Sequence, residues 1–303
     1  MLLLNTDTTT ISLRTWGVSD VGRVRDNNED SFLMVDLTTG AQITQEYTAP
    51  SPGFLLIVAY GMGGHEAGEI ASRMAVDVVS QYVSTHVASN RPPSRQRFVD
   101  ILKEAVVHAN TAIYVASQAD AKRNGMGTTL TAAGIYDGAA FFAQVGDSRA
   151  YVLRTTIVAQ MTRDQNLATE IAVAGREVPT QQAESSFQNV LLQALGAEPE
   201  VTVPVSFLEL RRGDWIVVCS DGLTNFVSDE EIGKLVHNAP DPQAACHALV
   251  TAANTSGGRD NITVITAYCD GPALLAPHLG ENPHVQEFVN SWWYRMLRRF
   301  QLQ

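Results

Sequence analysis

An unbroken apolar run, FLLIVA at residues 54–59, constrains the fold more than any other stretch of the chain. The run has the length of a strand and no polar alternation, which is typical of a strand buried on both faces. It stops at Tyr60, and a glycine-rich turn at 61–64 leads directly into apolar residues at helical spacing. The pattern predicts a covered strand that presents the Tyr60 side chain at a tight turn.

Four helices are predicted from the spacing of apolar residues and from their start signals. Helical periodicity covers 67–82 and 98–116, and two prolines precede the second of these segments. A capping-box spacing predicts a helix start at Ser228, and a further helix is expected over 242–254. The helices come in pairs between groups of strands, which favours an α+β architecture with antiparallel sheets over a doubly wound parallel sheet.

The remaining strands are expected over 128–160, 215–220 and 261–269. The first of these stretches holds short β-rich runs broken by Asp-Gly and Gly-Asp turns, and it predicts an antiparallel meander. Residues 163–200 are polar and irregular, and we interpret them as a flap. No linker interrupts residues 11–270, which predicts a single domain there.

Composition excludes some classes of function. The net charge of -11 argues against a general nucleic-acid binder, because such a protein needs a basic face to neutralise phosphates. The excess of carboxylates fits a soluble acidic protein, and some of them could bind cations. Three isolated cysteines indicate buried thiols in a reducing compartment, so we expect a cytoplasmic protein. No secretory signal and no apolar run of about 18 residues is visible.

Aspartates recur at the boundaries of apolar runs, beside Gly, Asn or Ser. The four of interest are Asp30, Asp147, Asp221 and Asp260. One aspartate in such a place is usually a turn former. Four that converge would repel one another unless cations lay between them, and the lack of a His/Cys cluster favours Mg²⁺ or Mn²⁺.

The motifs that hold these aspartates resemble those of a known family. In order they are SDVGRVRDNNED, GMGGHEAGE, GMGTTLTA, VGDSRAY, LLQALG, CSDGL and GRDNITV. Together they resemble the metal-dependent protein serine/threonine phosphatases of type 2C in their bacterial form. The resemblance covers residues 11–270, with extensions at 1–10 and 271–303. It implies a four-layer α-β-β-α sandwich of two antiparallel sheets flanked by helix pairs.

The resemblance also implies a metal centre of two to three Mn²⁺ or Mg²⁺ ions. Asp30, Asp221 and Asp260 fall on ligand positions of its binuclear part, as does the carbonyl of Gly61. Asp147 falls on the position of a third, weaker metal. The cations would activate water for attack on phosphorus.

Arg25 falls on the phosphate-binding arginine of the family, whose planar fork can hold two phosphate oxygens. The implied substrates are phosphoserine and phosphothreonine residues of proteins. The proton donor to the leaving group stays open, because Met62 stands where eukaryotic members have histidine. His65 is nearby, but a histidine in such a turn could equally be structural.

Tyr60 departs from the family, whose members hold an aspartate there that bridges both cations. A phenol has one oxygen and is neutral at pH 7, so it is a poor ligand for these cations. The substitution predicts weakened metal binding and reduced turnover. The readings left open are a recent or deliberate substitution in an otherwise active enzyme, a natural protein of low activity or one that only binds phosphoproteins, and a site rebuilt around the tyrosine. A smaller departure is Gln165, where many relatives have histidine.

The C-terminal extension shows one amphipathic helical face with a basic end. It either packs on the domain or a neighbouring molecule, or docks on a partner or an anionic membrane surface. We expect a monomer. The face and its basic end comprise Val285, Phe288, Val289, Trp292, Met296 and Phe300, followed by Arg295, Arg298 and Arg299.

Overall fold

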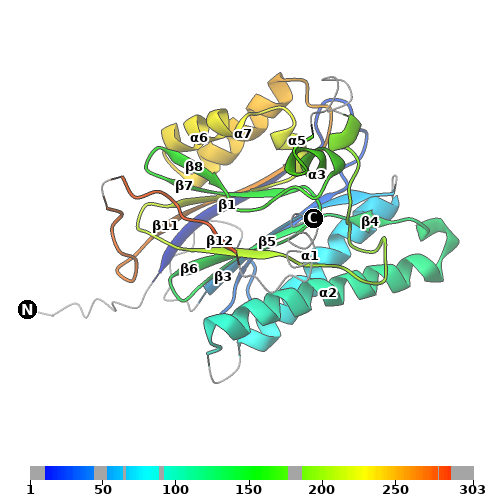
Figure 1. Ribbon diagram of the computed structural model, residues 1–303, viewed down its shortest axis with the longest axis horizontal. Coiled ribbons are helices and arrows are strands. Elements are labelled where there is room, and N and C mark those ends of the chain that lie inside the picture. The colour runs from blue at the N-terminus through cyan, green and yellow to red at the C-terminus, as the bar shows by residue number, and fades with distance from the viewer. Residues whose placement is uncertain are drawn as a thin grey trace, which may run out of the picture.

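The protein folds into four layers, with two antiparallel sheets packed face to face between two groups of helices (Figure 1). This arrangement confirms the predicted α+β sandwich. The structure is a computed structural model, and it describes residues 11–43, 53–63, 66–88, 92–176, 186–278 and 280–287.

The first sheet has five strands, and all its neighbours pair antiparallel. Its spatial order is β1 (Ser12–Asp20), β11 (Ile262–Asp270), β10 (Trp215–Cys219), β7 (Arg149–Arg154) and β8 (Ile157–Gln160). The second sheet has seven strands. Its order is β12 (Gln286–Glu287), β9 (Val205–Glu209), β6 (Ala139–Val145), β5 (Leu130–Tyr136), β3 (Gly53–Met62) and β2 (Asp30–Asp36), with β4 (Gly127–Thr128) paired to β3.

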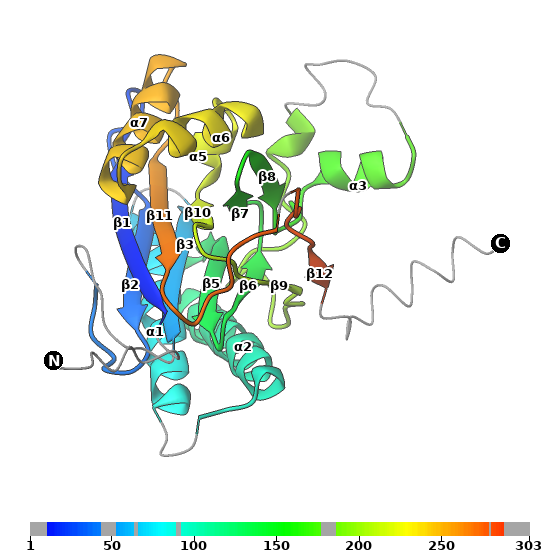
Figure 2. The ribbon, with the colours of Figure 1, turned by 90° about the vertical axis from the view of Figure 1, so that its left-hand side faces the viewer.

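Helices cover the outer face of each sheet, and Figure 2 shows the layers from the side. The long pair α1 (Glu66–Val87) and α2 (Arg95–Ala119) packs on the second sheet. On the first sheet lie α6 (Asp229–Asn238) and α7 (Pro242–Thr255), and the short α5 (Asp221–Thr224) follows β10. The short 3-10 helix η1 spans Ala121–Arg123.

Three apolar cores separate these layers. One lies between α1, α2 and the second sheet, one between the two sheets, and one between the first sheet and its helices. Strand β3 contributes alternate side chains to two of them, Leu55 and Ile57 to one and Leu56 and Val58 to the other. This two-sided burial explains why its sequence is continuously apolar.

The predicted helix starts are confirmed. The Ser94 side chain accepts the Arg97 N–H and caps α2, and the Ser228 side chain accepts the Glu231 N–H and caps α6. The prediction of a single antiparallel meander over 128–160 is wrong. Strands β5 and β6 form a hairpin in the second sheet, and then the chain crosses at Gly146 to β7 and β8 in the first sheet.

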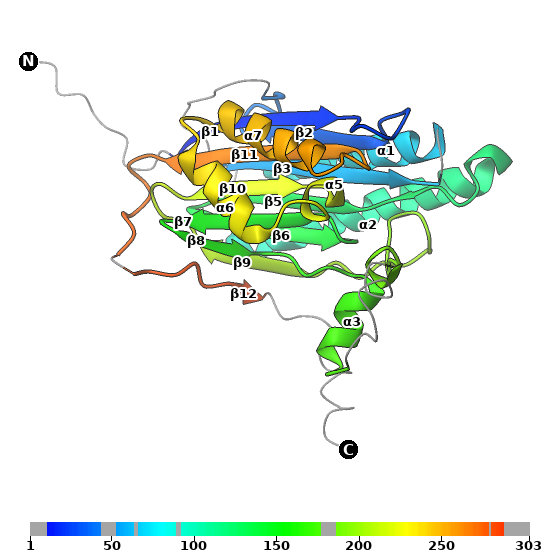
Figure 3. The same cartoon turned by 90° about the horizontal axis from the view of Figure 1, so that it is seen from above.

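The strands outside the predicted set are β1, β2, β9 and the short β12. Strand β1 lies at the edge of its sheet and is mostly half-buried, so its sequence mixes polar and apolar residues. The region interpreted as a flap contains α3 (Leu167–Val173), which projects away from the sandwich (Figure 3). Its residues 177–185 lie outside the described part.

The segment that follows β11 contacts the sandwich. Leu274 is buried, Glu281 accepts hydrogen bonds from Arg154 and Arg211, and β12 pairs with β9. The domain boundary at 270 stays a prediction. The predicted amphipathic helix is wrong at its start, because Gln286 and Glu287 pair with β9 as strand β12, and the rest of it lies beyond the described residues.

Candidate functional site

Strand ends from both sheets meet at one end of the sandwich, and they carry the predicted site residues. Asp30 begins β2, and Tyr60, near the end of β3, is its direct partner in the antiparallel register. In the other sheet, β10 ends just before Asp221 and the antiparallel β11 begins just after Asp260. Antiparallel pairing therefore brings residues far apart in sequence to the same edge.

Tyr60 lies among charged groups. Its half-buried ring is close enough to Asp221, Asp260, Arg25 and Asp30 to interact electrostatically with all of them. Burial, followed by the charges of Asp221 and Asp260, raises the pKa of the Tyr60 phenol above its ordinary value. The phenol is therefore neutral at pH 7 and brings no charge to a position surrounded by carboxylates.

Asp30 is held from the first sheet. The Ser220 hydroxyl donates to Asp30 Oδ2 at 2.8 Å and accepts the Thr263 N–H at 3.0 Å. Asn261 fixes the loop before Asp30, because its side chain accepts the Glu29 N–H at 2.9 Å and donates to the Asn27 carbonyl at 2.9 Å. Sequence reasoning missed these roles, although Ser220 and Asn261 directly adjoin Asp221 and Asp260 in the motifs.

Gly61 is required by a close approach of the backbone. A Cβ on Gly61 would lie 2.1 Å from the carbonyl oxygen of Gly68 in the first turns of α1. The Gly61 N–H donates to the Glu29 carbonyl at 3.0 Å, which ties β3 to the loop before Asp30. The structure thus gives this glycine a packing role that its sequence context did not indicate.

Asp147 occupies the crossing between the sheets, and Gln165 holds that crossing. The Gln165 side-chain carbonyl accepts the Gly146 N–H at 2.9 Å, and the Gln165 backbone N–H donates to the Gly146 carbonyl at 3.0 Å. Next to it, Asp164 forms an ion pair of 2.7 Å with Arg149, the first residue of β7. Gln165 therefore contacts the Asp147 turn directly, a role that the sequence did not reveal.

Arg25 pairs with a predicted metal ligand. Its guanidinium lies 2.9 Å from Asp260 Oδ2, and its side chain is 48% exposed, so much of the guanidinium faces solvent. The Asp260 carboxylate also accepts the N–H of Asn261 at 2.9 Å. Arg25 thus stands at the mouth of the carboxylate cluster, where an entering anion would meet it.

The buried carboxylates have the donor chemistry for hard cations. Asp30, Asp147 and Asp221 each keep one buried oxygen with no hydrogen-bond partner, and such orphaned acceptors are costly. Burial is the main reason that the pKa values of Asp147 and Asp221 are raised. Within the described part of the chain, however, no three His, Cys, Asp or Glu side chains group closely enough to hold one ion. The ligand types fit cations, but Tyr60 does not fit the bridging position.

The pH dependence of Asp30 is a testable consequence in metal-free protein. Burial raises its pKa from 3.8 to about 7, despite hydrogen bonds from Thr263 and Ser220. Its contribution to stability is fully present below the unfolded-state value and is lost as pH rises through about 7. In EDTA, we expect Asp30→Asn to stabilise the protein by about 2–4 kcal/mol at pH 8 but much less at pH 5. Urea unfolding at both pH values measures this, and an equal effect at both would contradict it.

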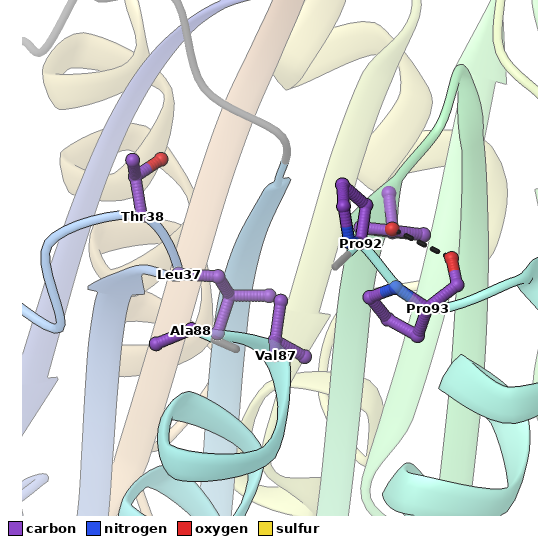
Figure 4. A pocket seen from close by; sticks show the side chains of 7 residues that line it. Leu37, Thr38, Val87, Ala88, Pro92 and Pro93 are labelled. Atoms are coloured by element: carbon purple, nitrogen blue, oxygen red, sulfur yellow. Dashed lines mark hydrogen bonds between the residues drawn. The ribbon is translucent and has the colours of Figure 1, made fainter. Parts of the chain in front are cut away.

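A cavity of about 150 Å³ lies at the other end of the sandwich (Figure 4). It is lined by Leu37, which follows the last residue of β2, by Val87 at the end of α1, and by Pro92 and Pro93. Its lining is apolar apart from the hydroxyls of Thr38 and Tyr136, so it cannot neutralise a phosphate. The charged end of the sandwich is the better candidate site.

Comparison with known proteins places this sandwich, with its aspartates at one end, among the protein phosphatases. Residues 43–253 match the family described as protein phosphatase 2C. The chain is 33% identical over 247 residues to the serine/threonine phosphatase stp of Listeria monocytogenes, covering 82% of this chain and 92% of that protein. The chain belongs to the protein phosphatase 2C family.

Solved structures agree with this assignment. The serine/threonine phosphatase PstP/Ppp of Mycobacterium tuberculosis has a TM-score of 0.70 and 32% identity, covering 86% of this chain and 99% of that one. A structure of the PstP catalytic domain in complex with two manganese ions has a TM-score of 0.69 and 33% identity, covering 86% of this chain and 100% of that one. No described helix of this chain is long and apolar enough to cross a membrane.

Proposed function

We propose that the chain is a protein serine/threonine phosphatase whose turnover is impaired by Tyr60. The observation that carries the proposal is the position of Tyr60, directly opposite Asp30 and within electrostatic reach of Asp221 and Asp260. The proposed substrates are phosphorylated proteins in the cytoplasm, and the three buried free cysteines are consistent with a reducing compartment.

The residues of the site have distinct proposed roles. Asp30, Asp221 and Asp260, with the Gly61 carbonyl, would hold two Mn²⁺ or Mg²⁺ ions, and Asp147 would contribute to a third. When bound, such ions supply charge stabilisation and lower the pKa of water.

The groups around these ligands orient the reaction. The exposed fork of Arg25 binds the phosphoryl oxygens of the substrate. Ser220 orients Asp30 through its hydrogen bond, so that one carboxylate oxygen stays directed into the site.

Tyr60 weakens this site for two reasons. Its neutral phenol replaces a full negative charge, which leaves the cations less well neutralised. Its ring, which lies within electrostatic reach of Asp30 and Asp221, also occupies volume that cations and water would need. Both effects lower metal affinity.

A second candidate function is phosphoprotein binding without hydrolysis. It is favoured by the absence, within the described residues, of a carboxylate group tight enough to hold an ion. Arg25 would still bind a phosphate in such a module.

Calorimetric titration with Mn²⁺ separates the two candidates. We expect two or more Mn²⁺ sites in the Tyr60→Asp variant and much weaker binding in the unchanged chain with Tyr60, which would support the impaired enzyme. Tyr60→Asn is the matched control, because it removes the ring without adding charge. Phosphopeptide binding without metal, together with no Mn²⁺ site in Tyr60→Asp, would favour the binding module.

A further inference from the structure

Two loops at the mouth of the site are fastened to each other. The Arg23 N–H donates to the Gly258 carbonyl at 2.6 Å. Gly22 has a φ of +82°, and a Cβ there would lie 2.2 Å from the Asp260 carbonyl oxygen. The loop that carries Arg25 is therefore held directly against the loop that carries Asp260.

The same two loops display two further arginines on consecutive glycines. Gly257 and Gly258 have φ values of +129° and +52°. A Cβ on Gly258 would lie 2.8 Å from Cγ of Arg23, and one on Gly257 would lie 3.7 Å from Cγ of Arg259. The lack of a side chain on Gly258 leaves room for the stem of Arg23, whereas a Cβ on Gly257 would only be in ordinary van der Waals contact with Arg259. We name Arg23 and Arg259 the basic rim.

The basic rim is exposed and its charges are not neutralised locally. Neither guanidinium makes a hydrogen bond or an ion pair with any residue that the structure describes, including the neighbouring exposed Asp26. The other nearby carboxylate, Asp20, accepts hydrogen bonds from the Gly22 N–H at 2.8 Å and from the Asn254 side chain at 3.1 Å.

The positive charge of the basic rim contrasts with the negative net charge of the chain. The chain carries a net charge of -11, and the adjoining site holds several carboxylates, so an anionic partner is repelled in general. Two unpaired cations beside Arg25 provide a local surface that such a partner can approach.

We propose that the basic rim binds a second anionic group of the substrate, close in sequence to the phosphoresidue. This rests on the proposed function, which places the phosphate at Arg25. Arg23 is two residues from Arg25, so their Cα atoms are at most about 7 Å apart, which matches about two residues of an extended peptide. The preferred peptides therefore carry Asp, Glu or another phosphoresidue two to three positions from the reacting one.

Fluorescence anisotropy tests the rim proposal in the full unchanged chain with Mn²⁺. The peptides carry a non-hydrolysable phosphonate analogue of phosphoserine. One peptide has Ala at the flanking positions, one has Glu and one has a second phosphonate. We expect the anionic peptides to bind more tightly at low salt and to lose this advantage in 0.5 M NaCl, where the Debye length is only about 4 Å.

Substitutions then assign the preference to the rim. Arg23→Gln and Arg259→Gln should each weaken binding of the anionic peptides about three- to fivefold, as exposed ion pairs do, and leave the Ala-flanked peptide unchanged. Arg23→Lys should restore most of the preference. Arg73→Gln is the control, since it removes an exposed arginine of α1 outside the rim. Comparison of the Glu and phosphonate peptides tells which anion is preferred.

Equal affinity of all three peptides, or equal loss in the Arg73 control, would overturn the rim proposal and leave the proposed phosphatase function intact. Arg25→Gln is expected to weaken all three peptides alike. If it has no effect while the rim variants do, the phosphate subsite is contradicted and the rim still stands as a site for anionic peptides.

Discussion

Tyr60→Asp is expected to raise Mn²⁺-dependent hydrolysis of a small aryl phosphate by about 100-fold or more. Losses of 10–100-fold are typical when only an outer partner of a metal ligand is removed, and a bridging ligand matters more. The variant returns a carboxylate to the position opposite Asp30 and removes the aromatic ring from the neighbourhood of the carboxylates. The increase is measured as the ratio of initial hydrolysis rates of the variant and of the unchanged chain, both at saturating Mn²⁺.

Two matched variants show whether missing charge or missing space limits the hydrolysis rate of the unchanged chain. Tyr60→Phe keeps the ring, so its hydrolysis rate should stay as low as that of the unchanged chain. Tyr60→Asn frees the space without adding charge and should recover only a small part of the gain. If the unchanged chain hydrolysed the substrate as fast as the Tyr60→Asp variant, the proposed impairment would be wrong. A site rebuilt around tyrosine would then be favoured.

Asp214→Ala is expected to cost about 3–5 kcal/mol of stability, because it removes the bidentate partner of a buried arginine and leaves only the Glu281 carboxylate to pair with it. Asp214 is fully buried and Arg154 is 3% exposed. Two hydrogen bonds of 2.9 and 2.8 Å join the Arg154 guanidinium to both carboxylate oxygens. Asp214 also accepts the Arg211 N–H at 2.8 Å, which shapes the turn between β9 and β10. Urea unfolding gives the change in free energy.

The double variant Arg154→Met/Asp214→Leu distinguishes a lost ion pair from a generally fragile region. Replacement of both partners by apolar side chains removes the unpaired charge, so we expect it to be clearly more stable than Asp214→Ala. Asp77→Ala breaks the exposed pair with Arg73 and should cost less than about 0.5 kcal/mol. A double variant as unstable as Asp214→Ala would contradict this explanation.

Strands and helices with strong local signals could be predicted from the sequence. The continuous apolar run of β3 and the cap at Ser228 are examples, because burial on both faces and capping leave direct marks on residue types. Strand β1 has a weaker sequence signal and was missed, because it lies at a sheet edge and is mostly half-buried. The crossing at Gly146 was missed because a turn between sheets uses the same residue types as a hairpin turn.

The site was predictable in its residues but not in its contacts. The motifs identified the aspartates, Arg25 and the replacement at Tyr60, and they did so through residue type and order alone. They did not show that Gln165 holds the Gly146 turn or that Ser220 donates to Asp30. Such contacts join segments that are far apart in the chain, so no local pattern records them.

By itself, the sequence determined the α+β class with antiparallel sheets through local periodicity, and it determined the family and the departure at Tyr60 through the resemblance of its motifs. Only the tertiary structure decided which strand ends meet, that Asp30 faces Tyr60, and that Arg23 and Arg259 flank the site entrance. The physical reason is that antiparallel pairing and sheet packing set distances between residues over two hundred positions apart, while periodicity describes only neighbours along the chain.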